Sequence, residues 1–166
     1  EEVLKNAELL VASATTRLTQ FFGLLPKTAL IVKPVEEYKE KNETAARYYP
    51  PPDDLSRPGI YYINTYDPPT RARFTMTSLA VHEGVPGHHL QIAIATEQRG
   101  LPAFRRQADF TAFVEGWALY SERLADEMGL YADDLARVGM LADQAGRACR
   151  LVVDTGIHSM GWDRQR

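Results

Sequence analysis

Apolar residues recur at helical spacing over residues 2–22, and this pattern predicts an amphipathic helix at the start of the chain. The positions on its apolar side are Val3, Leu4, Ala7, Leu10, Val11, Ala14, Leu18, Phe21 and Phe22. Gly23 and Pro26 end this helix, because glycine destabilises a helix and proline lacks the backbone N–H that the next turn needs. We expect a second, short and exposed helix over the highly charged residues 34–47.

Residues 59–66 are rich in aromatic and β-branched side chains, and this composition predicts a β-strand. The preceding residues 48–54 contain three successive prolines, which exclude a regular helix there. A single strand is only marginally stable by itself. We therefore expect its partner in the strand-like residues 28–33 or in polypeptide outside this chain.

The second half of the chain has the periodicity of helices. Helical patterns cover three stretches, residues 71–98, 103–128 and 132–160. Pro86 and Gly87 interrupt the first stretch, and Gly129 separates the second from the third. The predicted fold is mainly α, with a small β element before the helix that carries His82 and Glu83.

Composition narrows the function classes only slightly. A chain of 166 residues with 45% hydrophobic and 25% charged residues is enough for one domain with a real core. The net charge of −3 and the pI near 5.8 give no reason to expect a nucleic-acid or anionic-membrane partner. No stretch approaches the roughly 18 apolar residues of a membrane span.

The single Cys149 excludes an internal disulfide and a cysteine-based metal site. The chain begins inside a helical pattern and without a Met, so we expect residues 1–166 to be one domain cut from a longer protein. The cellular compartment therefore stays open.

The most informative stretch is residues 82–89, which read His-Glu-Gly-Val-Pro-Gly-His-His. Zinc hydrolases assemble their metal and general base from His-Glu-x-x-His, where the two histidines lie one turn apart on a helix. Here the position one turn after His82 is Pro86, which cannot bind a metal. On a straight helix His88 would lie about 240° around the axis, and His89 about 10.5 Å along it.

An unbroken helix therefore cannot bring two of these histidines to one metal. Pro86 and Gly87 favour a bulge that loops out the two extra residues and moves His88 to the usual position of the second ligand. We take His88 as the ligand and His89 as a supporting residue, although the spacing alone leaves the choice between them open. The alternative is that Pro86 and Gly87 simply end one helix and the histidines are surface or core residues.

A third ligand is expected from Glu115 or Glu122, which share one face of the next long helix. Apolar residues surround that face, and a carboxylate among them is costly unless it is paired or binds a metal. Either glutamate alternatively pairs with an arginine. The candidate arginines are Arg123, Arg147 and Arg150. Glu122 is also suited to hold a ligand histidine through its other ring nitrogen.

Three segments, residues 82–91, 115–122 and 154–162, resemble the bacterial family catalogued as domain of unknown function 885. Their order and spacing span most of the chain. Members of that family are usually several times longer, so this chain is similar to their C-terminal catalytic portion. The resemblance implies a distant relationship to helical zinc metallopeptidases of the gluzincin type, and hence a zincin-like core.

The same resemblance implies roles for four residues. His82 and His88 would be the zinc-binding histidines, Glu115 the glutamate ligand and Glu83 the general base. Zinc would lower the pKa of a bound water toward 7, and Glu83 would take its proton and pass it to the leaving amine. Family membership does not fix a substrate.

The tetrahedral oxyanion formed in such a reaction needs a further donor, for which His158 is a candidate. Arg150, Asp154 and His158 form one column on the last helix. Asp154 would orient His158, and Arg150 would receive a substrate carboxylate through a bidentate contact. The alternative is a salt-bridge ladder on a solvated face.

Substrate contacts are also expected at the strand of residues 59–66, whose end is suited to bind an extended peptide through its backbone. Tyr61 and Tyr62 are the candidate side chains there. They point to opposite faces of the strand, so at most one faces a cleft. Packing is the favoured interpretation for both.

We therefore predict a zinc-dependent hydrolase, and within that class a metallopeptidase that acts on peptides or peptide-like substrates. In such a protein, polypeptide N-terminal to this chain would complete the cleft. One alternative is a helical binding or scaffold domain without metal. Another is a zinc hydrolase of a non-peptide amide.

Overall fold

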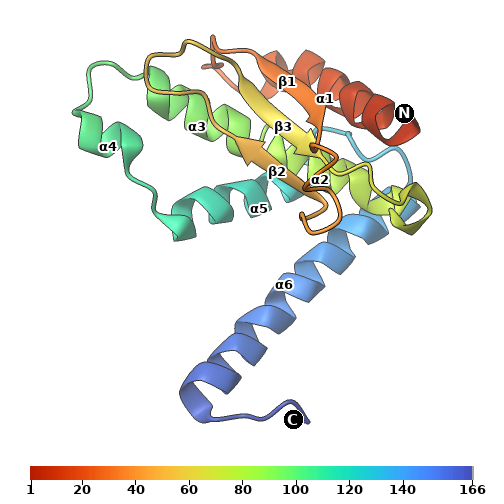
Figure 1. Cartoon of the computed structure of the whole chain (residues 1–166). Coiled ribbons are helices and arrows are strands. Elements are labelled where there is room, and N and C mark those ends of the chain that lie inside the picture. The colour runs from red at the N-terminus through yellow and green to blue at the C-terminus, as the bar shows by residue number, and fades with distance from the viewer. Residues whose placement is uncertain (166) are drawn as a thin grey trace.

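Helices make up most of the chain, and one small three-stranded sheet lies beside them (Figure 1). The computed structural model describes residues 1–165. In chain order the elements are α1 (Glu2–Phe21), β1 (Leu30–Pro34), β2 (Ala46–Tyr49), β3 (Gly59–Ile63), two short 3-10 helices (Pro68–Thr70 and Arg73–Thr75), α2 (Met76–Glu83), α3 (His88–Glu97), α4 (Ala103–Gln107), α5 (Thr111–Glu127) and α6 (Asp134–Met160). The predicted fold class, mainly α with a small β element before α2, is confirmed.

Helix α1 follows its sequence pattern closely. The helix predicted over residues 2–22 is observed over Glu2–Phe21, and Phe22 after it is extended. Its buried positions are Ala7, Val11, Ala14 and Leu18. This spacing of three and four residues places them on one side, which packs against the rest of the chain.

The sheet has the strand order β1-β3-β2, so β3 is central. Strand β1 runs parallel to β3, which confirms the strand-like residues 28–33 as a partner, and β2 runs antiparallel to it. Because both sides of β3 are paired, this strand has no free edge for a peptide. The expectation of substrate binding along β3 is therefore wrong, and the free edge on that side of the sheet belongs to β2.

The helix expected over residues 34–47 is also wrong. Turns occupy residues 37–42, and the chain then enters β2. Val35 is buried, and Glu36 forms ion pairs with Lys39 and Arg47 that fix the turn. Backbone pairing of β2 with β3 outweighs the helix preference of a charged segment, since that preference is a fraction of a kcal/mol per residue, roughly 0.7 at most.

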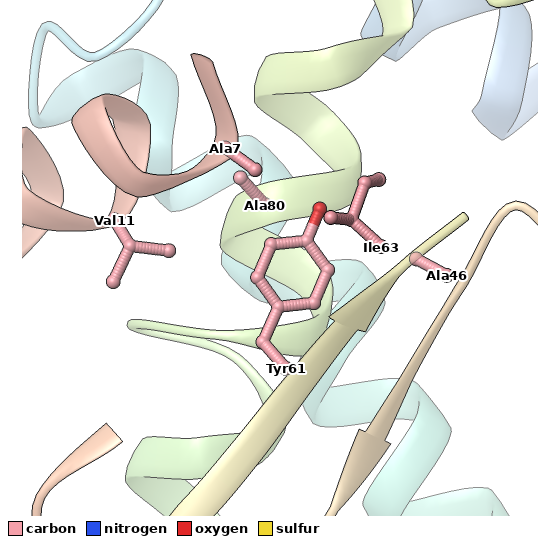
Figure 2. Close-up of a cluster of buried hydrophobic side chains, with 6 residues drawn as sticks. All are labelled: Ala7, Val11, Ala46, Tyr61, Ile63 and Ala80. Atoms are coloured by element: carbon pink, nitrogen blue, oxygen red, sulfur yellow. The ribbon is translucent and has the colours of Figure 1, made fainter. Parts of the chain in front are cut away.

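Helix α2 lies at the centre of the packing. On one side, Ala80 joins a core between α1, α2 and the inner face of the sheet (Figure 2). The buried members of this core are Ala7, Val11, Ala46, Tyr61, Ile63 and Ala80. On the other side, Val81 packs with Ala125 and Tyr131 near the end of α5 and with Met140 of α6. The residue that follows Val81 is His82, so the packing of α2 on two sides fixes where that histidine lies.

The two C-terminal helices differ in how closely they follow the sequence pattern. The helix predicted over residues 103–128 is interrupted after Gln107, and α5 begins at Thr111. Helix α6 is continuous, with Asp133 capping its first turn through a hydrogen bond from the N–H of Ala136. Its C-terminal half stands away from the other elements (Figure 1), and residues 149–155 are all exposed.

No helix within residues 1–165 combines the length and the apolar character that crossing a bilayer requires.

Candidate metal centre

The chain between α2 and α3 makes a wide turn that replaces the expected bulge. Helix α2 ends at Glu83 and α3 begins at His88, so the motif is divided between two helices. The N–H of Gly87 donates to the carbonyl of Val81 at 2.9 Å, and the N–H of His89 donates to that of Gly84 at 3.0 Å. These bonds span six and five residues instead of the four of an α-helix, which accommodates the extra residues of the motif.

Helix α5 holds this turn in place from the side. The indole N–H of Trp117 and the hydroxyl of Ser121 both donate to the carbonyl of Pro86, at 2.9 and 3.2 Å. This carbonyl lies where the helical pattern is broken, so a partner from another element satisfies it. The position of α3 relative to α2 therefore depends on α5.

The turn places His88 beside His82, as the sequence geometry requires for a shared metal. The Nε2 atom of His82 lies 3.5 Å from Oε2 of Glu115, and Nε2 of His88 lies 3.7 Å from Oε1 of the same carboxylate. One donor atom from each of the three residues lies within 4.8 Å of the others. Ligands held 2.0–2.2 Å from a tetrahedral zinc are about 3.4 Å apart. The two histidine–glutamate separations are close to this value, so the three side chains are suited to hold one metal ion.

Glu122 and Arg147 hold His82 from the other side of its ring. The Nδ1–H of His82 donates to Oε1 of Glu122 at 2.7 Å. Arg147 of α6 donates to both oxygens of this carboxylate, at 2.8 and 2.9 Å. Because Nδ1 carries the proton, Nε2 keeps its lone pair toward Glu115. This arrangement orients a metal-binding histidine and favours the tautomer that ligation needs.

The two glutamates of α5 have different surroundings, although both lie on the same helix face and looked equivalent in the sequence. The side chain of Glu122 is 0% exposed, whereas that of Glu115 is 57% exposed. Burial of a carboxylate among apolar residues is costly, and Glu122 is buried in this way. The same expectation is wrong for Glu115, whose side chain is largely exposed. Exposure of Glu115 leaves the candidate metal position accessible from solvent.

Burial also sets the charge state of His88. Its pKa is lowered, first by burial and then by the neighbouring His82, so the ring is neutral near pH 7. A neutral imidazole is the form that binds a metal. The ring of Tyr48 stacks on that of His88 at 6.4 Å, and the rings of His82 and His88 meet edge to face at 4.8 Å. Packing holds His88, because its buried Nδ1 has no hydrogen-bond partner within residues 1–165.

His89 faces away from this centre and does not compete with His88. Its Nδ1 accepts from the hydroxyl of Tyr48 at 3.0 Å, and its Nε2–H donates to the carbonyl of Thr28 at 3.1 Å. Burial lowers the pKa of His89 to about 4, which keeps the ring neutral. His89 thus joins α3 to β2 and to the segment before β1.

Glu83 lies next to His82 at the end of α2. Burial raises the pKa of its carboxyl, and the negative charge of Glu115 raises it further. The nearby His82, a hydrogen bond from the backbone N–H of Tyr48, and the charge of Arg147 act in the opposite direction. A carboxyl whose pKa is moved up toward neutrality is suited to take and return a proton.

Neither tyrosine proposed for substrate binding reaches the metal centre. Tyr61 is almost fully buried and packs in the core between α1 and α2 (Figure 2), so the substrate role is wrong for this residue. Tyr62 points to the opposite face of β3, where the guanidinium of Arg47 lies 4.9 Å from the centre of its ring. Packing explains both side chains.

The column of Arg150, Asp154 and His158 lies on the projecting half of α6. Nε2 of His158 is 3.7 Å from Oδ1 of Asp154, and both side chains are about three-quarters exposed, 73% and 74%. Arg147 contacts the metal centre, and His158 lies roughly 16 Å farther along the helix axis. The described residues therefore do not bring His158 or Asp154 to the metal ligands, and Arg150 makes no ion pair within residues 1–165. Their catalytic and substrate roles stay predictions.

Comparison with known families identifies the group to which this fold belongs. Residues 1–166 match the family model described as bacterial protein of unknown function, DUF885. The chain belongs to the DUF885 family. A search of curated proteins finds no match for it.

A solved structure shows the same arrangement of elements. The crystal structure of a proposed lipoprotein from Colwellia psychrerythraea is 38% identical to the DUF885 chain and superposes with a TM-score of 0.95. The match covers 99% of this chain and 28% of that protein. The chain thus spans a little over a quarter of the length of this relative.

The sequence did not predict the contacts that three residues, Tyr48, Trp117 and Arg147, make at the DUF885 centre. Tyr48 carried no signal, because its neighbouring prolines indicated only irregular structure. The apolar pattern around Trp117 indicates only packing, whereas its indole N–H holds the turn at Pro86. Arg147 was one of three candidate partners for a glutamate, and helical spacing alone could not choose among them.

We expect Gly87→Ala to disrupt the turn of the DUF885 motif. A Cβ atom at this position would lie 2.0 Å from the carbonyl oxygen of His82 and 2.3 Å from that of Val81, so the end of α2 must move. The free energy of unfolding in urea should fall by about 1–3 kcal/mol. Gly100→Ala, where nothing lies within 4 Å, is the control, and equal stability of both variants would contradict the prediction.

Proposed function

We propose that this DUF885 chain carries the catalytic centre of a zinc-dependent hydrolase, and specifically of a metallopeptidase. One observation carries the proposal: two buried histidines and an accessible glutamate bring three donor atoms within 4.8 Å of one another, close enough to share one metal ion. The adjacent Glu83 supports it, because a site with three protein ligands, an open position and a neighbouring carboxylate is typical of zinc hydrolases.

Each residue has a distinct task in this proposal. His82, His88 and Glu115 would hold zinc, which supplies an activated water and polarises the carbonyl of the bond to be cleaved. Glu83 takes the proton of the attacking water and returns it to the leaving nitrogen. Glu122 and Arg147 keep the Nδ1–H of His82 in place, so the lone pair on Nε2 stays directed at the centre.

The free edge of β2 favours an extended peptide as the substrate. The N–H of Asn64 donates to the carbonyl of Ala45, and this register directs the backbone groups of Ala46 and Tyr48 away from β3. The N–H of Tyr48 donates to Glu83, so the edge passes the general base. The carbonyl of Ala46 accepts from the hydroxyl of Thr44, which leaves the N–H of Ala46 and the carbonyl of Tyr48 for a substrate. An extended chain that bonds to these two groups would lie beside the reacting groups.

Metal content tests the proposal first. We expect about one zinc per chain after reconstitution, because three ligand side chains lie close together, and loss of that zinc in His88→Ala and in Glu115→Ala. Elemental analysis of the dialysed protein measures the ratio. His158→Ala is the matched control, since this exposed histidine lies apart from the donors and its variant should keep the metal. Absence of stoichiometric zinc in the unmodified chain would end the enzymatic interpretation.

Digestion of a peptide library then tests the reaction. A chelator should stop cleavage, and zinc added back should restore it. A zinc-loaded chain that cleaves small amides but no peptide would support hydrolysis of a non-peptide amide instead.

A further inference from the structure

A pocket lies between α3, α4, α5 and the loop of residues 50–53, and α3 and α5 also carry candidate metal ligands. Its volume is about 640 Å³, within the range of small-molecule sites. Two of its lining residues are close in sequence to metal ligands: Gln91 follows His88 by one helical turn, and Val114 directly precedes Glu115. The charge of Asp109, another lining residue, acts on His88. Helices α3 and α5 therefore contribute residues both to the pocket and to the candidate metal centre.

The wall of this pocket is mainly apolar. Its apolar lining residues are Ile92, Ala95, Phe104, Phe110, Phe113 and Val114. The side chains of Phe104 and Phe110 are about 70% exposed, at 72% and 70%, and that of Phe113 is 57% exposed. Solvent-exposed aromatic side chains clustered around one pocket indicate a binding surface, because exposure of apolar rings to water is unfavourable.

Some of the charged groups at the pocket pair with one another. Asp53 pairs with Arg106, whose side chain is only 10% exposed, and also with Arg99 at 3.3 Å. Arg105 and Asp109 line the pocket as well, and neither forms an ion pair within residues 1–165. The apolar part of the wall therefore decides in favour of an apolar occupant.

Gln91, one of the lining residues, has one unsatisfied polar atom. Its Oε1 atom is buried and has no hydrogen-bond partner within residues 1–165. A buried acceptor without a donor is unfavourable, so a ligand that supplies an N–H to it gains free energy. The backbone of a peptide supplies such a group close to each side chain.

We propose that this pocket receives a large apolar side chain of a peptide, aromatic or branched aliphatic, from a residue that flanks the cleaved bond. Gln91 then hydrogen-bonds the backbone beside that residue, and the exposed phenylalanines enclose the side chain. This inference rests on the proposed function and adds its substrate class: peptides with a bulky apolar residue next to the scissile bond.

Binding without cleavage tests this preference. Four peptides that differ at one central residue, Phe, Leu, Ala or Glu, are titrated into the Glu83→Gln chain by calorimetry, with and without zinc. The Phe and Leu peptides should bind about 10- to 100-fold more tightly than the Ala and Glu peptides, because the pocket removes their side chains from water. Equal affinity for all four would overturn the proposal.

Two variants localise the effect. Ala95→Trp fills the pocket and should remove the preference for Phe and Leu. Phe113→Ser removes one exposed ring without a core substitution and should weaken that preference. Phe21→Ser, at an exposed phenylalanine on α1, is the matched control and should leave it unchanged. A preference that survives both pocket variants would place the apolar side chain elsewhere and overturn the proposal.

These experiments distinguish failure of the pocket proposal from failure of the proposed peptidase function. Selective binding by a chain that takes up no zinc supports the pocket and removes the peptidase. Zinc-dependent cleavage with no preference among the four peptides supports the peptidase and removes the pocket.

Discussion

Glu83→Gln is expected to lower kcat for peptide cleavage by about 10²- to 10⁴-fold, the usual contribution of a positioned general base. The amide keeps the shape of the side chain and cannot take a proton from water. The neighbouring His82, His88 and Glu115 are unchanged, so zinc content should stay the same. The rate per zinc atom, measured on one peptide with elemental analysis of the same sample, checks this result.

A matched control separates lost proton transfer from a general effect of removing a carboxylate. Glu127 is exposed at the end of α5, and Glu127→Gln should cleave at the original rate. If Glu83→Gln retained its full rate per zinc atom, Glu83 would not be the base.

Glu122→Leu should produce the largest loss of stability. This substitution leaves the guanidinium of Arg147 and the Nδ1–H of His82 without their acceptor. Removal of one partner of a buried pair costs about 3–5 kcal/mol, so the free energy of unfolding in urea should fall by that amount. Zinc affinity should fall by about 10- to 100-fold, because the histidine loses the group that orients it.

A second substitution distinguishes the two roles of Glu122. In Glu122→Leu combined with Arg147→Met, no buried charge is left unpaired, so much of the stability should return. Zinc affinity should stay low, since His82 still lacks an acceptor for its Nδ1–H. Recovery of both properties together would mean that Glu122 acts on the metal only through the stability of the fold.

The spacing of apolar residues along the sequence predicted those helices that pack through one continuous apolar face. Helix α1 and the end of α6 lie within two residues of their predicted limits, because caps and periodicity act over a few neighbouring residues. Strand β2 was missed for the opposite reason. Its residues carry little strand signal, and pairing with a strand distant in sequence decides their conformation.

The candidate site could be predicted to the extent that ligand geometry limits the choices. The distance between His82 and His88 on a straight helix required a distortion at Pro86 and Gly87, and the structure has one there. Whether that distortion was a bulge or a break depended on contacts from α5, which a pattern within residues 82–89 cannot contain. The contrast between Glu115 and Glu122 likewise arises from neighbouring helices.

The dependence of the centre on α5 limits how this family can change in length. Within two turns, α5 contacts both ring nitrogens of His82, through Glu115 and Glu122, and the carbonyl of Pro86. One inserted or deleted residue between the two glutamates would turn one of them about 100° away from its histidine nitrogen. We therefore expect insertions and deletions to be tolerated outside residues 115–122, for example in the connection from α3 to α5, and not between the two glutamates.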